Sequence, residues 1–523
     1  MLSLTTEMLV IGGGATGAGV AWDASLRGLD VILVDRLDLA EGTSGRFHGL
    51  LHSGGRYAVK DAPAARECIA ENRILRRVAA DCIEDTGGMF VTTPWDDPAY
   101  AHRFAEACGD TGIDCEEIPV AQALRDEPRL NPRISRAFRV PDANIDVWKT
   151  VWAMAHGAER RGARILPYHE VTAIRRDGDR VTGAKLRDVR AGEDITVDAR
   201  VTVNASGAWA GRIAALAGIE GVRVFPGRGI MIAMNHRLVN TVINRCQMPS
   251  DGDILVPIRT VSVIGTTDEH TEDPDDHTVQ QSEVDKMLDD GERLVPGLRQ
   301  ARALRVWTGV RPLFEDAKAT DTATRDVTRA HTLLDHRSRD GVEGFVTITG
   351  GKITTYRLMA EETVDAVCDI LGKPSPCTTA TQPLPGSETG VNYRLGERLA
   401  RKEAQLRDEQ VICECELVSR DALEQALSSS GSTNLDDIRR RLRLGMGPCQ
   451  GGFCIYRAIG ILHGRSGVST EQANESLVGF LQERWKGVWP ILYGDQLRQM
   501  RLDEWIFHGV LDVDHLPTGV ADR

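Results

Sequence analysis

The order of apolar and polar residues near the N-terminus predicts a strand, a turn, a helix and a second strand. Met8–Ile11 is a short apolar run typical of a buried strand. Ala15–Arg27 has the spacing of a helix and is followed by Gly28, which can end it. Leu29–Val34 is a second apolar run, and it ends at Asp35. Two such strands joined by a helix indicate an α/β fold.

The turn between the first strand and the helix carries a glycine pattern. Gly12, Gly14 and Gly17 form G-x-G-x-x-G, and Asp35 stands at the tip of the second strand. In a dinucleotide-binding unit these glycines permit the turn, the approach of a pyrophosphate and close packing of helix on strand, and the acid binds a ribose. A glycine-rich turn in another kind of α/β protein is the alternative, and the complete unit makes it the weaker one.

The same reading of apolar spacing covers much of the remaining chain. Helices are predicted at Ala62–Val78, Trp148–Arg161 and Ala360–Leu371, and another begins near Glu283. Short apolar runs between prolines and glycines predict a small sheet at 86–145, and alternation of period two predicts strands at 164–203 and 222–270. The chain is therefore expected to combine a dinucleotide-binding unit with a strand-rich part.

Composition narrows the classes of protein. The 523 residues suffice for roughly two to four domains. A net charge of −13 gives no electrostatic basis for nucleic-acid binding, so an anionic substrate must be met by local basic residues. No signal peptide is visible, and no apolar run approaches the ~18–20 residues of a membrane-spanning helix. We therefore expect a cytoplasmic chain with reduced thiols, attached to a membrane only peripherally or through a partner.

The C-terminal part contains a group of cysteines. After a stretch rich in proline and serine that begins at Pro374, Cys413-x-Cys415 and Cys449-x₄-Cys454 bring four thiols to glycine-permissive turns. Thiolates bind iron–sulfur clusters or zinc, but this spacing departs from the paired C-x₂-C of common zinc sites. A [2Fe-2S] cluster is favoured, and zinc or a site that has lost its metal are the alternatives. Isolated cysteines such as Cys68 and Cys246 are expected to be small buried residues.

The identity of the dinucleotide depends on a distant segment. Thr347–Met359 reads as a strand, a glycine pair with Lys352, and a helix N-terminus. A second contact of this kind, far from the N-terminal unit, suits a long FAD better than NAD, which is the alternative. Arg36, which follows Asp35, is compatible with a 2′-phosphate.

Five motifs along the chain resemble those of flavin-dependent glycerol-3-phosphate dehydrogenases. They are GTSGRFHGLLHSGGRYAVKDA, NASGAWA, GTTD, WTGVRPLF and TGGKITTYRLMAEE, in this order. Wider relatives are flavoproteins of the D-amino-acid-oxidase type. The C-terminal CEC…GMGPCQGGFC and ERWKGVWPILYGDQLR are similar to the A subunits of the anaerobic enzymes and to bacterioferritin-associated-ferredoxin-like [2Fe-2S] domains. The resemblance spans roughly residues 7–510.

This resemblance implies an α/β fold with three parts. A FAD-binding Rossmann-type domain interleaved with a β-rich substrate domain occupies 1–373, and a linker follows at 374–408. A small helical [2Fe-2S] domain covers 409–465. The tail, 466–523, either docks a partner or folds back on its own domain.

The resemblance also implies an activity: FAD takes a hydride from sn-glycerol 3-phosphate, giving dihydroxyacetone phosphate. Electrons then leave through the Fe–S cluster and partner subunits towards a membrane quinone, so the chain is expected at the cytoplasmic face of the membrane. A dehydrogenase or oxidase of a 2-hydroxy acid or amino acid is the alternative enzyme. An electron-transfer or metal-sensing scaffold is the alternative without enzymatic activity.

The matching motifs also imply which residues of this chain form the site. Arg56, Tyr57, Arg311 and Lys352 match substrate-binding positions, and His52 and Arg311 are the catalytic candidates. The implied FAD contacts are Gly12, Gly14, Gly17, Asp35, Thr43, Ser44, His52, Ser53, Ala205, Gly207, Gly350, Gly351, Lys352 and Thr354. Metal ligands are Cys413, Cys415, Cys449 and Cys454.

The general base is less clear than the other roles. His52 titrates near neutrality and suits this role, but hydrogen bonding to flavin or loop is an equal alternative. Relatives carry a histidine where this chain has Arg228 and Gly229 in FPGRGIMI, which puts the base or one phosphate contact in question. Arg46 and Arg228 are weaker candidates for binding an anion.

Overall fold

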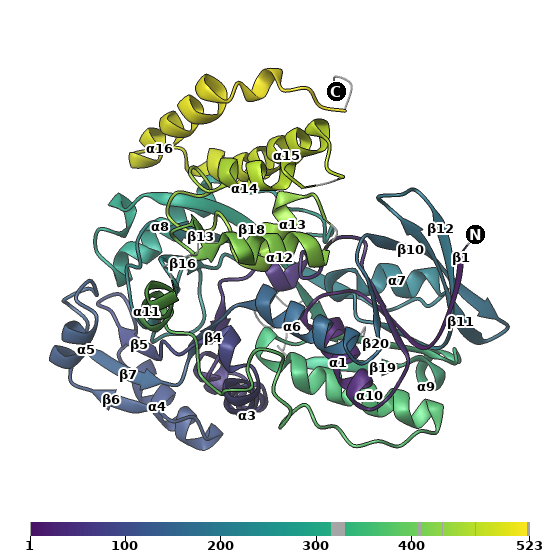
Figure 1. The fold of residues 1–523 in the computed structure, drawn as a ribbon. Coiled ribbons are helices and arrows are strands. Elements are labelled where there is room, and N and C mark those ends of the chain that lie inside the picture. Colours follow the sequence, from purple (N-terminus) through teal and green to yellow (C-terminus); the bar gives the residue numbers. More distant parts are fainter. Residues whose placement is uncertain (1, 315–329, 406–409, 431, 466, 520–523) are drawn as a thin grey trace.

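The computed structural model describes residues 2–314, 330–405, 410–430, 432–465 and 467–519. Its first sheet is built around the N-terminal unit and runs in the order β10-β11-β12-β1-β2-β9, with β20 beside β12 and β19 beside β20 (Figure 1). The bounds are β1 Leu2–Ile11, β2 Val31–Val34, β9 Arg164–Leu166, β10 His169–Asp177, β11 Arg180–Asp188, β12 Asp194–Asn204, β19 His331–Asp335 and β20 Phe345–Gly350. Because β1 pairs in parallel with both β2 and β12, the carboxyl ends of these strands meet at one edge.

A second sheet forms the strand-rich part. Its order is β17-β13-β16-β15-β14-β5-β7-β6, with β18 paired along the length of β13. The bounds are β5 Gly88–Thr92, β6 Glu116–Ile118, β7 Arg136–Val140, β13 Val224–Met234, β14 Val242–Arg245, β15 Ile254–Ile258, β16 Val261–Gly265, β17 Glu269–His270 and β18 Ala303–Phe314. Short strands β3 Leu50–Leu51, β4 Ile83–Glu84 and β8 Ala143–Ile145 make a small sheet of their own.

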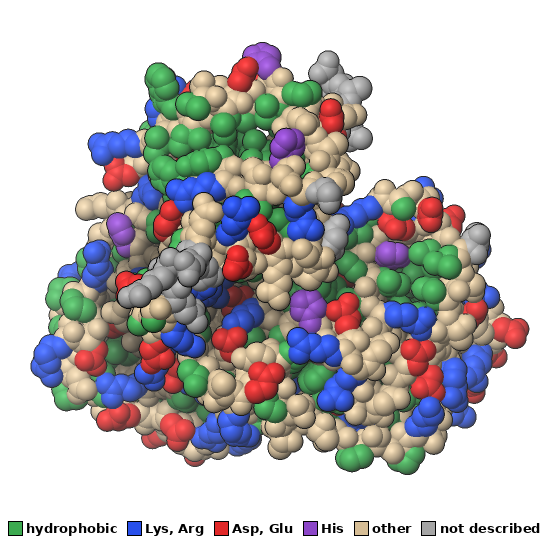
Figure 2. All heavy atoms as spheres, in the orientation of Figure 1, with side chains coloured by type: hydrophobic (Ala, Val, Ile, Leu, Met, Phe, Trp, Pro, Cys, Tyr) green, Lys and Arg blue, Asp and Glu red, His purple; other side chains and the backbone are tan. Residues whose placement is uncertain are grey.

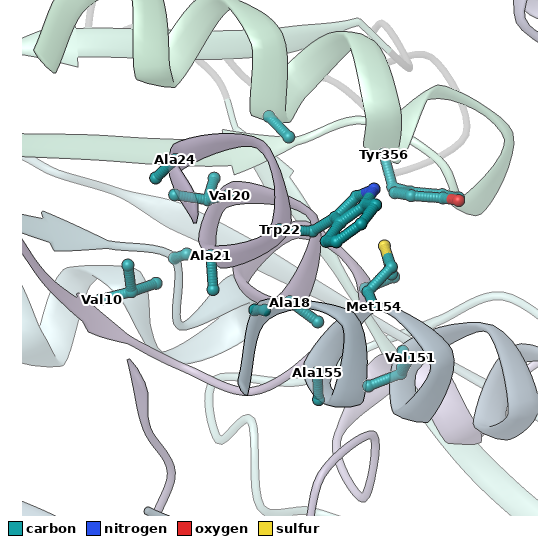
Figure 3. Packing of buried hydrophobic residues seen from close by; sticks show 14 of the residues in the cluster. Val10, Ala18, Val20, Ala21, Trp22, Ala24, Val151, Met154, Ala155 and Tyr356 are labelled. Carbon is teal, nitrogen blue, oxygen red and sulfur yellow. The ribbon is translucent and has the colours of Figure 1, made fainter. Parts of the chain in front are cut away.

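Helices cover these sheets and fill the space between them. They are α1 Ala15–Leu26, α2 Gly55–Ala58, α3 Ala62–Val78, α4 Tyr100–Thr111, α5 Val120–Asp126, α6 Val147–Glu159, α7 Ala210–Leu216, α8 Gln281–Leu294, α9 His336–Asp340 and α10 Tyr356–Leu371. Helix α1 packs between α6 and α10, and its Trp22 lies against Met154 and Tyr356 (Figure 3). Small residues such as Ala18 and Ala21 let the three helices approach closely, and this packing supports the N-terminal strand–helix unit.

The C-terminal part is a separate helical unit on top of the two sheets (Figure 1). It contains α12 Arg420–Ser430, α13 Leu435–Leu442, α14 Ile455–His463, α15 Thr470–Val488 and α16 Asp495–Glu504, with the hairpin β21 Val411–Cys413 and β22 Val418–Ser419. Helix α11 Leu395–Gln405 precedes this unit in the chain and lies lower in the molecule, near β4 (Figure 1). Residues from 412 to 513 form a hydrophobic core of their own. Phe480 and Phe507 belong to that core, so part of the tail folds back on its own unit.

Buried ion pairs join this unit to the sheets. Glu416 accepts hydrogen bonds from Arg259 at 3.0 Å and from Arg443 at 3.1 Å. Arg440 lies 3.2 Å from Asp38, which follows the second strand of the N-terminal unit. These side chains are all buried, so the two parts meet across a buried, charged joint.

The secondary structure follows the sequence predictions closely, with five differences. The first strand begins at Leu2, six residues before the predicted Met8, because it pairs with β12 from that residue on. The second strand begins at Val31 because the Leu29 N–H still donates to the Ala24 carbonyl at the end of α1. Segment 86–145 contains α4 and α5 besides its strands, and α10 begins four residues before the predicted Ala360. The predicted linker at 374–408 contains α11 and buries Leu384 and Tyr393, so it is packed on the fold in its described part; residues 406–408 lie outside the described residues.

Within the described ranges, no helix is long and apolar enough to span a membrane. Hydrophobic side chains gather over the C-terminal helices on the face that Figure 2 shows. Large apolar residues exposed in this unit are Phe453, Trp485, Trp489, Leu497, Leu502, Trp505 and Val510. Such a concentration of exposed apolar groups is typical of an interaction surface.

The packing of Trp22 allows a test of the core. We expect Trp22→Ala to destabilise the protein by about 3–5 kcal/mol, since it removes a large side chain from a closed interior. Trp489→Ala is the matched control, because that indole is 58% exposed and its loss should change stability by less than about 0.5 kcal/mol. Urea unfolding of both variants measures the difference. Equal unfolding midpoints would contradict the packing of Figure 3.

Candidate functional site

A cavity of about 1000 Å³ runs between the carboxyl ends of the first sheet and the second sheet. Residues far apart in the sequence line it, from Gly12 and Asp35 through the loop at 41–48 to Arg311 and Lys352. Cavities at the carboxyl ends of parallel strands are the usual ligand sites of open α/β sheets. Its elongated lining suits a dinucleotide together with a small substrate.

The glycine end of the cavity depends on close backbone contacts. A Cβ atom on Gly17 would lie 1.8 Å from the carbonyl oxygen of Gly12, so only glycine lets α1 pack there. Gly12 has φ of +109°, and a Cβ on it would lie 2.6 Å from the carbonyl oxygen of Ala205. The N-cap residue of α1, Gly14, has no side chain to cap the helix, and the Ala15 N–H donates to the Ser44 hydroxyl at 3.0 Å. Gly12, Gly14 and Ala15 line the cavity. This arrangement fits a pyrophosphate on the helix N-terminus.

Asp35 lies beside this turn. One carboxylate oxygen accepts a hydrogen bond from the Gly13 N–H at 2.7 Å, and the other accepts from the Leu37 N–H at 2.9 Å. Burial raises the pKa of Asp35 to about 6, although these two hydrogen bonds oppose the shift. Each oxygen keeps a further lone pair, so the carboxylate is held in place and can still accept from ribose hydroxyls.

Most of the residues predicted to hold the cofactor line this cavity. Those that do are Gly12, Gly14, Asp35, Thr43, Ser44, His52, Ala205, Gly207, Gly350, Gly351 and Lys352. Gly17, Ser53 and Thr354 lie behind the wall instead. The backbone N–H of Ser53 donates to buried Asp142 at 2.6 Å, and the backbone N–H of His52 donates to the Thr354 hydroxyl at 3.1 Å. These three residues shape the wall rather than face the cavity.

The predicted substrate residues meet at the other end. Arg311 is held by Asp268 at 2.6 Å, by the Thr266 hydroxyl at 2.5 Å and by the Thr267 carbonyl at 2.7 Å. Gly229 leaves room for it, because a Cβ there would lie 2.7 Å from a guanidinium nitrogen.

Arg56 is held in a similar way. It pairs with buried Asp253 at 2.8 Å, and the Lys352 ammonium lies 5.2 Å from the Tyr57 ring centre. Oriented guanidinium groups at a cavity wall suit a phosphate or carboxylate.

Sequence motifs did not single out His48, which also lines the cavity. Its ring centre lies 6.0 Å from that of His52, which in turn lies 5.3 Å from that of Tyr57. Burial and the charges of Arg56 and Arg311 lower the pKa of His48 to about 3. The motif that contains both histidines was a signal for it, but nothing in the pattern distinguishes the two.

The two weaker candidates for binding an anion, Arg46 and Arg228, lie in different surroundings in the structure. Arg46 lines the cavity. Arg228 is buried and is not among the cavity residues: it pairs with Glu283 at 3.1 Å and donates to the Thr278 carbonyl. Arg228 therefore supports the second sheet and does not line the cavity.

The four predicted metal ligands come together in the C-terminal unit. Cys413 ends β21, Cys415 is in the following turn, and Cys449 and Cys454 flank a glycine turn before α14. The Cys449 thiol lies beside those of Cys415 and Cys454, and the Cys454 thiol beside that of Cys413. These contacts lower the pKa of Cys449, and that of Cys413 is lowered by its contact with Cys454. All four are free cysteines, which leaves their sulfurs available as ligands.

These four cysteines are the kind of ligand set that a [2Fe-2S] cluster uses, because cysteine thiolates hold each of its irons.

Comparison with known proteins agrees with this two-part organisation. The model of the family "FAD dependent oxidoreductase" matches residues 7–365. The model of the "BFD-like [2Fe-2S] binding domain" matches residues 411–463, which contain the four cysteines.

Relatives extend over nearly the whole chain. The A subunit of the anaerobic glycerol-3-phosphate dehydrogenase of Escherichia coli strain K12 is 45% identical, covering 98% of both chains. The A1 subunit of the enzyme of the same name from Haloferax volcanii is 42% identical, covering 98% of this chain and 91% of its own. A solved glycerol-3-phosphate dehydrogenase from Bacillus halodurans, complexed with FAD, shares the fold with a TM-score of 0.60 at 21% identity, covering 99% of this chain and 97% of its own. The chain therefore belongs to the FAD-dependent oxidoreductase family and, within it, to the A subunits of anaerobic glycerol-3-phosphate dehydrogenase.

Proposed function

We propose that this protein oxidises sn-glycerol 3-phosphate to dihydroxyacetone phosphate with FAD as the hydride acceptor. The observation that carries the proposal is one continuous cavity, which joins a dinucleotide-binding glycine turn to three oriented cations, Arg56, Arg311 and Lys352. A phosphate dianion needs charge-assisted partners, and the net charge of −13 means that these must be local. The names of the relatives that match nearly the whole chain support the same substrate.

Different residues of the cavity have different roles in the proposed reaction. Gly12, Gly14 and Asp35 would hold the pyrophosphate and ribose of FAD, and Thr43 and Ser44 line the same cavity. When bound, the flavin supplies the acceptor for the hydride of the carbinol carbon.

At the reacting end, Arg311 and Arg56 bind the anion, with Tyr57 and Lys352 beside them. His52, which lines the same cavity, is the candidate to take the hydroxyl proton.

The cysteine unit is the proposed acceptor of electrons from the flavin. We propose that Cys413, Cys415, Cys449 and Cys454 hold a [2Fe-2S] cluster that accepts electrons singly. Each of the two relatives is named as one component of a larger enzyme, which indicates further subunits. The exposed tryptophans of the tail, Trp485, Trp489 and Trp505, are the surface we propose for a partner that passes electrons to a membrane quinone.

The activity is tested by adding glycerol 3-phosphate to the anaerobically purified protein. The flavin absorption should bleach, and dihydroxyacetone phosphate should form in equal amount. Lactate, 2-hydroxyglutarate and amino acids serve as comparison substrates. Bleaching by one of these, and not by glycerol 3-phosphate, would make the protein a different flavin dehydrogenase.

Arg311 provides a test of the anion site. We expect Arg311→Ala to raise KM for glycerol 3-phosphate by about 30- to 150-fold, which is the ~2–3 kcal/mol of a charged hydrogen bond. Arg299→Ala is the control, because that arginine pairs with Asp289 on the surface and does not line the cavity. Steady-state kinetics with a dye acceptor measure both. An unchanged KM in the Arg311 variant would remove this residue from the site.

Cys449 provides a test of the electron route. Cys449→Ser should abolish the iron signal and leave bleaching of the flavin by substrate largely intact, because the thiol lies outside the cavity. Cys377→Ser is the control, since this half-buried cysteine contacts Thr379 and none of the four ligands. Iron analysis and flavin absorption report the two effects separately. Retention of iron in the Cys449 variant would rule out this ligand set.

A further inference from the structure

His48 is held at one ring nitrogen by its own loop. The backbone N–H of Leu50 donates to Nδ1 of His48 at 3.2 Å. The tight turn that brings these atoms together depends on Gly49, whose φ is +85° and whose Cβ would lie 2.6 Å from the Asn144 amide. Gly265 lies against the ring from the other side, since a Cβ there would lie 3.3 Å from Cδ2 of His48. The imidazole is therefore fixed by backbone on both sides.

This hydrogen bond settles the state of the ring. A neutral imidazole has one N–H and one acceptor nitrogen, and here Nδ1 is the acceptor, so the proton is on Nε2. A doubly protonated ring would direct a second N–H at the Leu50 N–H, so the contact disfavours the imidazolium as well. The neighbouring charges of Arg56 and Arg311 act in the same direction. His48 is neutral and has no free acceptor nitrogen.

The remaining nitrogen is available to a group bound in the cavity. His48 lines the cavity, and within the described residues its ring accepts a hydrogen bond at Nδ1, whereas Nε2 has no hydrogen-bond partner. The ring stands near the reacting end of the site, with His52 at 6.0 Å and the charges of Arg56 and Arg311 close enough to act on it. An N–H at this place can donate, and it cannot accept a proton.

We propose that His48 is a fixed neutral hydrogen-bond donor of the reacting end: its Nε2–H binds an acceptor atom of the substrate or of the flavin and takes no proton. This rests on the function proposed above. A neutral imidazole with a strongly lowered pKa is a known way to hold an oxygen that becomes a carbonyl without giving up a proton. The two histidines of the motif then have separate roles, His48 as donor and His52 as the candidate base.

The main test compares the rate of flavin reduction by glycerol 3-phosphate under anaerobic stopped-flow conditions. His48→Leu should slow flavin reduction by about 10- to 100-fold. This range lies between the effect of losing an ordinary hydrogen bond and that of losing an oxyanion-hole donor. His48→Gln should recover most of the rate, because its amide N–H comes near the place of Nε2. His156→Leu is the control: this histidine packs on Trp152 in α6, away from the cavity. An unchanged rate in His48→Leu would overturn the proposal.

The pH profile separates a donor from a base. The rise of the reduction rate between about pH 6 and 9 should persist in His48→Leu at a lower amplitude, because another group takes the proton. Disappearance of this rise in His48→Leu would overturn the proposal and make His48 the base.

Two equilibrium measurements identify what the N–H binds. A shift of the flavin midpoint potential in substrate-free His48→Leu would identify the flavin as acceptor. A weaker dissociation constant for dihydroxyacetone phosphate, with the potential unchanged, would identify the substrate. If neither quantity moves, the proposal is overturned.

Two outcomes of the main test need a further comparison. If His48→Leu fails to bind flavin, the rates of flavin reduction in His48→Gln and His48→Asn test the proposal. The Asn amide N–H lies near the place of Nδ1 and not of Nε2, so His48→Asn should remain slow. Equal rates in these two variants would overturn the proposal. If glycerol 3-phosphate does not reduce the flavin of the wild-type protein, the proposed substrate is overturned and not the role of His48. The flavin midpoint potential of His48→Leu, compared with that of the wild type, would then test His48 alone.

Discussion

The contact between Gly17 and Gly12 determines where the cavity begins. With 1.8 Å between a notional Cβ on Gly17 and the Gly12 carbonyl oxygen, no other residue type fits without moving α1 away from β1. Helix α1 is then fixed between α6 and α10, and β1 between β2 and β12. The cavity lies at the edge where these strands end, so the positions of both the glycine turn and the distant Lys352 loop depend on this one approach.

Sequence patterns predicted the parts of the site that are local in the chain. The strand, glycine turn, helix and Asp35 follow one another within about thirty residues, so spacing alone indicated them. The same holds for Cys413 with Cys415 and for Cys449 with Cys454, although their meeting across 33 residues depended on a resemblance. Arg311 and Lys352 also came from motifs, and the structure brings both to the cavity that Gly12 lines.

What spacing could not predict was which partner each charged side chain finds. Arg228 and Arg311 both lie in strand-rich segments, but Arg228 meets buried Glu283 while Arg311 is turned by Asp268 towards the cavity. His48 and His52 are four residues apart on either side of β3, and the hydrogen bond from Leu50 to His48 is a tertiary detail that the motif does not encode. Ser53 and Thr354 fit the motif of a cofactor loop, but hydrogen bonds to Asp142 and to His52 place them behind the wall. These outcomes depend on tertiary contacts that periodicity does not encode.

The buried joint around Glu416 has a consequence for how electrons leave the protein. Opening it would separate Glu416 from Arg259 and Asp38 from Arg440, and would lift Arg441 from the Trp152 ring, 3.6 Å away. For the cysteine unit to swing away on each turnover, these buried charges would have to lose their partners together, and buried charges without partners are costly. If the cysteine unit carries electrons as proposed, this joint favours a stationary relay over a tethered shuttle. Electron transfer would then take place over a constant gap, and the acceptor would have to come to the relay.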